Sequence, residues 1–310
     1  MKEINYREYF EQKVQALTDY VKKYNLEALV LGISGGIDST ICAAICYEVS
    51  KRIPVKVIGR SLPTMNNKDE EITTADLVGN AFCTDYKEVN IQQLYNTVRI
   101  GVNTAEFPTT SYNLIANGNI QARLRMIYLY NLASIHKGIV IDTDNLTEHN
   151  LGYFTIHGDQ GDVNPIGDLW KTQVFELAEW LLLHYSFQLP HNMYEATPEQ
   201  LEKSGKVFQQ GRAIKESLKL KPTAGLGITN NDLEEIGAES YDQVDNILQE
   251  ILAWKRLAIK RGDLPEDLKE QKEMFLDEQQ MLTIPIEIII NVTNKHFASE
   301  FKRKQMPIRL

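Results

Sequence analysis

The amino-acid sequence of 310 residues predicts an α/β protein, with a parallel sheet covered by helices on both faces and a mostly helical C-terminal part. Two observations predict this fold. From residue 28 to residue 141, short continuous apolar runs alternate with segments of helical periodicity, which is typical of parallel strands joined by crossover helices. After residue 152, helical patterns predominate. We expect a single domain over residues 1–310.

Each element in the first half follows from its own pattern of apolar side chains. Helical spacing predicts four helices, over residues 4–24, 40–47, 69–82 and 113–136. Continuous apolar runs predict strands at residues 28–32, 55–58 and 138–141, with a shorter candidate at residues 86–90. Right-handed crossovers between parallel strands would place a binding site at the carboxyl ends of these strands.

The second half of the chain begins with a loop and continues as a series of helices. The loop over residues 157–168 is rich in glycine and aspartate, and a helix is predicted over residues 171–185. Residues 283–301 fit either element, because the run Ile-Pro-Ile-Glu-Ile-Ile-Ile is β-branched enough for a strand. The apolar residues there recur at helical turns, so we predict a helix.

Composition and charge exclude several classes of protein. Hydrophobic residues make up 43% and charged residues 24% of the chain, values typical of globular proteins. No apolar run approaches the roughly 18 residues of a membrane span, and the N-terminal residues lack a secretory pattern. We therefore expect no membrane association and a cytoplasmic location. A net charge of −9 disfavours a nucleic-acid partner. The cysteines Cys42, Cys46 and Cys83 follow no metal-binding spacing.

The most informative motif joins the first predicted strand to the next helix, over residues 31–40 (LGISGGIDST). Gly35 and Gly36 can adopt positive φ and let an anion approach the backbone, and the helix start adds free N–H groups. Asp38 cannot bind a phosphate directly, so we expect it to hold a divalent cation against one. A strand-ending turn with a capping aspartate is the plainer alternative. The motif lacks the lysine of a Walker-type loop.

The run Ser-Gly-Gly-x-Asp-Ser at residues 34–39 resembles the signature loop of the N-type ATP pyrophosphatases. The resemblance implies a Rossmann-like fold of the adenine nucleotide alpha hydrolase type. It also implies cleavage of ATP between its α and β phosphates and adenylylation of a substrate oxygen. The residues expected to bind ATP in this loop are Gly32, Ile33, Ser34, Gly35, Gly36, Ile37, Asp38 and Ser39. Members of the group make GMP, asparagine, argininosuccinate or NAD, or modify tRNA, so the loop alone does not select an activity.

Five further segments resemble the ammonia-dependent NAD synthetases within this group. They are residues 118–126 (GNIQARLRM), 141–155 (IDTDNLTEHNLGYFT), 162–171 (DVNPIGDLWK), 221–226 (KPTAGL) and 302–307 (KRKQMP). The resemblance implies roles for single residues in them. Contacts with ATP are expected from Thr143, Lys171 and Thr223. Contacts with the second substrate are expected from Arg123, Asp162 and Lys302. Mg²⁺ is expected at Asp38 and Glu148, and the catalytic residues would be Asp38 and Lys171.

Elementary chemistry is consistent with these assignments. Two carboxylates from distant chain positions, together with phosphate oxygens, suit Mg²⁺, which keeps few protein ligands. A lysine such as Lys171 near the α-phosphate would offset the charge that develops there. Arg123 and Arg125 are two residues apart on a predicted helix, so they point to different faces and only one would reach into a cleft.

The resemblance implies an enzyme that converts deamido-NAD to NAD with ATP and ammonia. The reaction would pass through an acyl-adenylate and release AMP and pyrophosphate. The synthetase accounts for almost the whole chain, so we expect no glutaminase domain and free ammonia as the nitrogen donor. We also expect a homodimer, an insertion at about residues 194–220, and a mobile lid at about residues 221–231.

Three alternatives remain at this point. Amidation of nicotinate mononucleotide would use the same reacting carboxylate. A tRNA-modifying ATP pyrophosphatase would need a basic surface that the acidic composition disfavours. A non-catalytic nucleotide-binding module would need the phosphate loop but neither Glu148 nor Lys171. The sequence departs from the resemblance at Asp142, Ile156 and Phe301, where the family often has Gly, Lys and His.

Overall fold

Four strands form the parallel sheet, in the order β3–β2–β1–β4. They are β1 (Ala28–Gly32), β2 (Lys56–Ser61), β3 (Asp85–Glu88) and β4 (Gly138–Val140). The computed structural model describes residues 4–102, 111–186, 188, 197–222, 232–278, 283–304 and 308–309. Central strand β1 pairs with both neighbours, so that Leu29 lies beside Val57 and Ile139. The predicted fold class and parallel strands are therefore confirmed.

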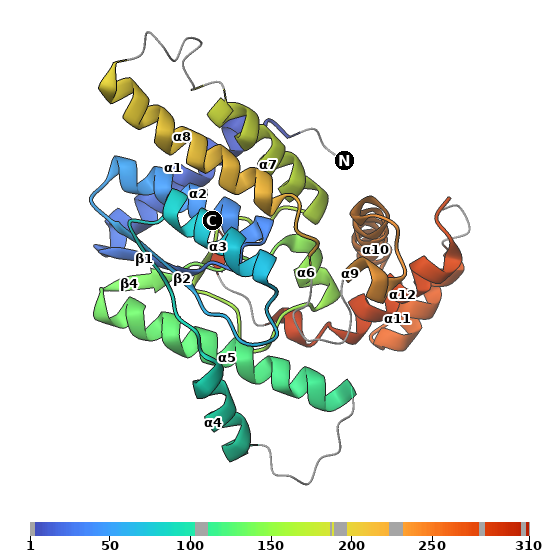
Figure 1. The fold of residues 1–310 in the computed structure, drawn as a ribbon. Coiled ribbons are helices and arrows are strands. Elements are labelled where there is room, and N and C mark those ends of the chain that lie inside the picture. The colour runs from blue at the N-terminus through green and yellow to red at the C-terminus, as the bar shows by residue number, and fades with distance from the viewer. Residues whose placement is uncertain are drawn as a thin grey trace.

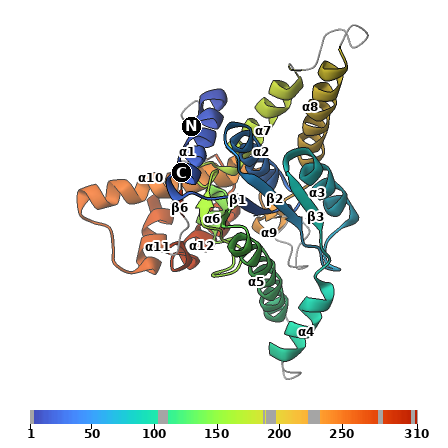
Figure 2. The same cartoon turned by 90° about the vertical axis from the view of Figure 1, so that its left-hand side faces the viewer.

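The alternation of side chains along β1 explains why helices cover both faces of the sheet (Figures 1 and 2). Leu29 and Leu31 lie in one core cluster, and Ala28 and Val30 lie in another. The first cluster includes residues of α1 (Tyr6–Tyr24), α2 (Ile37–Arg52), α3 (Asp69–Phe82), α7 (Lys171–Ser186) and α8 (Pro198–Ser217). The second includes residues of α4 (Gln92–Val102) and α5 (Ser111–Ile135).

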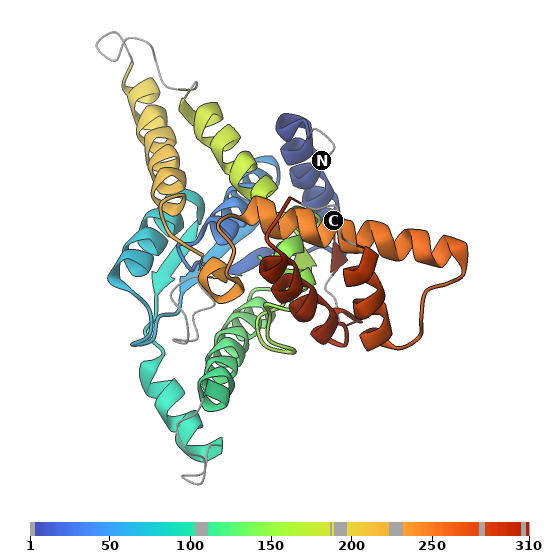
Figure 3. The same ribbon diagram turned by 90° about the vertical axis from the view of Figure 1, so that its right-hand side faces the viewer.

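The C-terminal helices form a separate layer with its own core beside the sheet domain (Figure 3). They are α9 (Asp232–Ile236), α10 (Tyr241–Arg261), α11 (Leu268–Glu278) and α12 (Ile286–Ala298). Short helix α6 (Leu146–Leu151) follows β4 and packs against α7, α10 and α12. Leu151 and Trp170 join this core from the sheet side. Helix α6 therefore contacts both the helices that cover the sheet and the C-terminal helices.

Most predicted elements are present, with some changed bounds. The helix predicted at residues 40–47 begins at Ile37 and ends at Arg52, and the ambiguous segment at residues 283–301 contains helix α12 as predicted. Helix α4 was not predicted. The segment expected to be an insertion contains α8, whose Val207, Ala213 and Ile214 are buried in the main core; that it is an insertion relative to the family stays a prediction.

Two short strands were also missed, β5 (Val163–Asn164) and β6 (Ile308–Arg309), which pair in parallel. Residue Ile141 bridges to Val163, so this pair extends the edge of the sheet beyond β4. In the described part of the chain, no helix is long and apolar enough to cross a membrane. The expected lid lies outside the described residues, apart from residues 221 and 222.

Candidate active site

The loop between β1 and α2 is shaped by its glycines and hydroxyl groups. Gly35 has φ +85°, and a Cβ there would lie 2.5 Å from the backbone oxygen of Glu71. Ser34 Oγ accepts a hydrogen bond from the Gly36 N–H at 3.2 Å and lies 3.1 Å from Ser39 Oγ. The loop closes tightly at the N-terminus of α2, where an anion would meet N–H groups and the positive end of the helix dipole.

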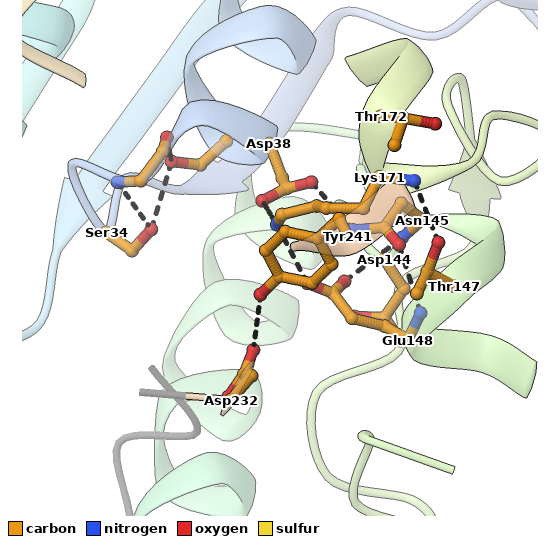
Figure 4. A network of polar contacts seen from close by, with 12 residues as sticks. Ser34, Asp38, Asp144, Asn145, Thr147, Glu148, Lys171, Thr172, Asp232 and Tyr241 are labelled. Atoms are coloured by element: carbon orange, nitrogen blue, oxygen red, sulfur yellow. Dashed lines mark hydrogen bonds and ion pairs between the residues drawn. The ribbon is translucent and has the colours of Figure 1, made fainter. Parts of the chain in front are cut away.

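Three charged side chains from separate elements meet beside this loop (Figure 4). Lys171 Nζ, at the start of α7, lies 2.5 Å from Asp38 Oδ2 on α2 and 3.1 Å from Glu148 Oε1 on α6. Lys171 is 1% exposed, whereas the carboxylates keep more surface. The structure therefore brings together the three residues for which the sequence suggested cation and phosphate chemistry. We name Asp38, Glu148 and Lys171 the charged triad.

Asn145, at the cap of α6, holds two members of the triad in place. Its side-chain amide donates to Asp38 Oδ1 at 2.8 Å, and its side-chain oxygen accepts from the Glu148 N–H at 3.0 Å. Its own N–H donates to Glu148 Oε2 at 3.1 Å, which completes a capping box. The cap therefore fixes the Glu148 side chain and turns it toward α2. Sequence reasoning did not single out Asn145, although the spacing Asn-x-x-Glu is a recognisable cap.

The surroundings of the triad shift the pKa values of its members. Burial opposes the charged form of Lys171, but Asp38 and Glu148 outweigh it and raise the pKa of the ammonium. Burial raises the pKa of Glu148 to about 7, with Lys171 lowering it and Asp38 raising it. Burial, together with Asp142 and Asp159, also raises the pKa of Asp144 well above its usual value. The Lys171 ammonium is thus surrounded by several carboxyl groups.

The donor set in this neighbourhood fits Mg²⁺. All candidate donors are carboxylate oxygens, which a hard divalent cation prefers. Among the described residues, Asp144 Oδ2 and Asp232 Oδ1 are buried without a hydrogen-bond partner. No group of three metal-binding side chains lies together in the described ranges. A cation at Asp38 and Glu148 would therefore need oxygens from another source, such as a nucleotide phosphate.

The remaining predicted residues lie around the triad at different places. Thr143 is half-buried between β4 and α6. Arg123 is exposed and donates to the backbone oxygen of Ile156 at 3.0 Å. The inward position is taken by Arg125, which donates to the Leu62 oxygen at 3.1 Å. The two arginines thus point to different faces of α5, as predicted. Thr223 lies outside the described residues.

Asp162 and Lys302 both contact backbone groups of this chain. Asp162 accepts from the Val140 N–H at 2.9 Å and from the Tyr130 hydroxyl at 3.1 Å. Lys302 donates to the backbone oxygens of Gly152 and Phe154, at 2.8 and 2.9 Å. Neither contacts the charged triad, and their predicted roles in substrate binding remain predictions.

Of the positions where the sequence departs from the expected pattern, Asp142 has a structural explanation. Asp142 is 1% exposed and accepts from the N–H groups of Asp144 and Gly161, at 2.7 and 3.0 Å, so it fixes the turn after β4. Ile156 is half-buried, and only its backbone carbonyl contacts Arg123, so this contact does not depend on the isoleucine side chain. Nothing in the structure explains Phe301, which is 62% exposed.

Comparison with known proteins places the chain in a family. The NAD synthase family model matches residues 9–306. An NH3-dependent NAD⁺ synthetase from Thermoplasma volcanium is 30% identical over 260 residues, which cover 83% of this chain and 88% of that protein. Another from Pyrococcus furiosus is 30% identical over 301 residues, covering 96% and 94%. The solved structure of NMN synthetase from Francisella tularensis has a TM-score of 0.69, with 26% identity over 99% of both chains. The chain therefore belongs to the NAD synthase family and is an ATP-using ligase that forms a carbon–nitrogen bond.

Proposed function

We propose that this enzyme amidates the nicotinate carboxylate of deamido-NAD with ammonia, using ATP to activate the carboxylate. The observation that carries the proposal is the charged triad beside the phosphate loop, in a chain with the overall fold of this family. Nucleotide phosphates bound in the loop would lie close to Lys171 and to the two carboxylates that pair with it. Two relatives that cover most of the chain, from Thermoplasma volcanium and Pyrococcus furiosus, are ammonia-dependent NAD synthetases.

The first step joins the carboxylate to AMP. A carboxylate oxygen attacks the α-phosphorus of ATP, the bond to the bridging oxygen breaks, and pyrophosphate leaves. The Ser34–Ser39 loop and the N-terminus of α2 would orient the phosphates, which fixes the geometry of the attack. Lys171 would donate its N–H groups to phosphate oxygens, where its charge offsets the developing negative charge. Asp38 and Glu148 would hold Mg²⁺, which supplies further charge neutralisation when it is bound.

The second step forms the amide. The nitrogen of ammonia attacks the acyl carbon, AMP leaves with the electrons of the C–O bond, and a proton is lost from nitrogen. The site must keep water from the adenylate, because water would return the carboxylate. Residues 221–231, with Thr223, are the expected lid for this purpose.

Nicotinate mononucleotide is the second candidate substrate. The Francisella tularensis structure, which is similar over 99% of both chains, is that of an NMN synthetase. The chemistry at the carboxylate would be the same for both substrates. The difference lies in whether the site also accepts the adenylate half of the dinucleotide.

Pyrophosphate release tests both candidates. Purified protein would be supplied with ATP, Mg²⁺ and ammonium, and with deamido-NAD or nicotinate mononucleotide in separate reactions. We expect release that depends on deamido-NAD, with NAD as the product. Faster release with the mononucleotide would keep the mechanism and change the substrate. Absence of pyrophosphate release with both compounds would contradict the proposed function.

A homodimer is also part of the proposal. Helices α4 and α5 expose a series of apolar side chains, which would be costly to leave in water. They are Leu94, Ile100, Ile115, Ile127 and Ile135. We expect this surface to be covered by a second copy, which sedimentation equilibrium can measure. The cytoplasmic location remains a prediction.

A further inference from the structure

Helix α10 approaches the active site with two side chains that sequence reasoning did not single out. Tyr241 and Asp245 are four residues apart near the start of α10, so they lie on one face of the helix. This face is turned toward α6 and α7, which carry Glu148 and Lys171. The C-terminal layer thus contacts the two elements that supply the charged triad.

Asp245 is fully buried and binds the start of both elements. Its Oδ1 accepts a hydrogen bond from the Thr147 hydroxyl at 2.5 Å, and its Oδ2 accepts from the Thr172 N–H at 3.0 Å. The Thr147 oxygen in turn accepts from the Lys171 N–H at 2.8 Å. The N–H groups at the start of α7 have no intrahelical acceptor, so this relay satisfies them. It also places a carboxylate at the positive end of α7.

Tyr241 contacts the other end of the same lysine. The Lys171 ammonium lies 5.9 Å from the centroid of the Tyr241 ring, within cation–π distance (Figure 4). The Tyr241 hydroxyl donates to Asp232 Oδ2 at 3.3 Å. The Lys171 backbone is therefore held by Asp245, through Thr147, and its ammonium, which pairs with the two carboxylates, also faces the Tyr241 ring.

We propose that Tyr241 and Asp245 are positioning residues that set where the Lys171 ammonium meets the substrate phosphates. This inference rests on the proposed function, because it gives Lys171 a role in the transfer to the α-phosphate. Thr147 is adjacent to Glu148, so the relay also fixes α6 relative to α7. A local helix cap within α7 would satisfy the same N–H groups but would not tie α7 to both α6 and α10.

Variants of Thr147 test the relay with little change in volume. Thr147→Val removes the hydroxyl and nearly keeps the shape, whereas Thr147→Ser keeps the hydroxyl. We expect kcat to fall by about 10- to 100-fold in Thr147→Val, as for small misplacements of a catalytic group, with KM for ATP little changed. Thr147→Ser should restore most of the rate. Asp245→Asn should resemble Thr147→Val, and the two changes together should cost no more than one.

Tyr241 is tested by a second matched pair. Tyr241→Phe keeps the aromatic face and loses only the bond to Asp232, so its kcat should stay near that of the wild type. Tyr241→Leu removes the aromatic face, and its kcat should fall by roughly 3- to 30-fold. Equal rates for the Phe and Leu variants would contradict the role given to the ring.

Chemical labelling of Lys171 tests whether Thr147 and Asp245 position this lysine, and it needs no measurement of activity. Lysines would be acetylated for a short time with an N-hydroxysuccinimide ester, and modification at each lysine would be measured by mass spectrometry. Acetylation of Lys171 should rise in Thr147→Val and Asp245→Asn but not in Thr147→Ser. Lys13, a buried lysine on α1, provides the internal control for loss of fold.

The possible results separate the two proposals. Unchanged labelling of Lys171 in Thr147→Val and Asp245→Asn would overturn the positioning role. Labelling that rises equally at Lys13 would also overturn it, because the change would then be general unfolding. Absence of pyrophosphate release from the wild type would count against the proposed function, while the labelling would still decide whether Asp245 fixes Lys171.

Discussion

Replacing Lys171 with methionine removes the single ammonium between two carboxylates. The substitution shortens the unbranched side chain by one atom and leaves Asp38 and Glu148 beside each other in a site where Lys171 was 1% exposed. Coulomb attraction at about 3 Å with an effective dielectric constant of about 20 is roughly 5 kcal/mol per pair, before desolvation is subtracted. Removing one partner of such a buried pair costs about 3–5 kcal/mol. We therefore expect Lys171→Met to lower the free energy of unfolding by about 3 kcal/mol at pH 8.5.

The loss should become smaller as the pH falls. Burial raises the pKa of Glu148 to about 7 in the folded protein even with Lys171 present, so folding favours its neutral form. This contribution to stability is complete below the unfolded pKa of about 4.5 and is lost as the pH rises through 7. Without the ammonium the folded pKa rises further, and the loss extends to higher pH. At pH 6 a protonated Glu148 no longer repels Asp38, so the part of the loss that comes from Glu148 should disappear, whereas the part that comes from the lost Lys171–Asp38 pair should remain.

Chemical denaturation at pH 6 and pH 8.5, with and without Mg²⁺, provides the assay. Mg²⁺ should stabilise Lys171→Met more than the wild type, because the two carboxylates are then unpaired and open to a cation. Lys13→Met is the matched control, since it removes a buried lysine from a salt bridge with Asp168 instead. The reasoning would be refuted if Lys171→Met were as stable as the wild type at pH 8.5, or if Mg²⁺ stabilised both lysine variants equally.

Three further predictions concern the loop, the cation site and the C-terminal layer. Asp38→Asn should lower the rate of pyrophosphate release by at least about 100-fold while the circular dichroism spectrum stays unchanged; near-normal turnover would remove Asp38 from the mechanism. Gly35→Ala should lower the free energy of unfolding by about 1–3 kcal/mol and weaken ATP binding, because φ is +85° and the new Cβ would lie 2.5 Å from the Glu71 oxygen. Chemical denaturation and ATP titration measure these two effects. Burial and the nearby Arg303 lower the pKa of His296 to about 3, so its contribution to stability is present above pH 6.5 and is lost as the pH falls toward 3. Between pH 7 and pH 4.5 the wild type should therefore lose up to about 3 kcal/mol relative to His296→Gln, and parallel pH profiles of the two proteins would contradict this.

The parts of the site that could be predicted are those with a local pattern. The run of residues 34–39 follows an apolar strand and precedes a helix, and these three features occur together in sequence. Glu148 and Lys171 were recognisable because the segments around them resemble a family pattern. Their meeting with Asp38 then follows from topology, because β1 and β4 are neighbours and their carboxyl ends lie at one edge of the sheet.

The parts that could not be predicted depend on tertiary packing. An aspartate and a tyrosine four residues apart on a helix are ordinary surface residues in most sequences, and only the docking of α10 buries Asp245. Strands β5 and β6 have two residues each and are separated by almost half of the chain, so no local pattern marks them. Asn145 was within reach, because the spacing Asn-x-x-Glu before a helix indicates a capping box.

The most direct test of the central claim is the exchange of labelled pyrophosphate into ATP in the absence of ammonia. An acyl-adenylate forms reversibly, so we predict exchange that requires both Mg²⁺ and deamido-NAD and that stops when ammonium removes the intermediate. Exchange that occurs without any carboxylate substrate, or amide formation with no exchange under any condition, would contradict activation of the carboxylate by adenylylation.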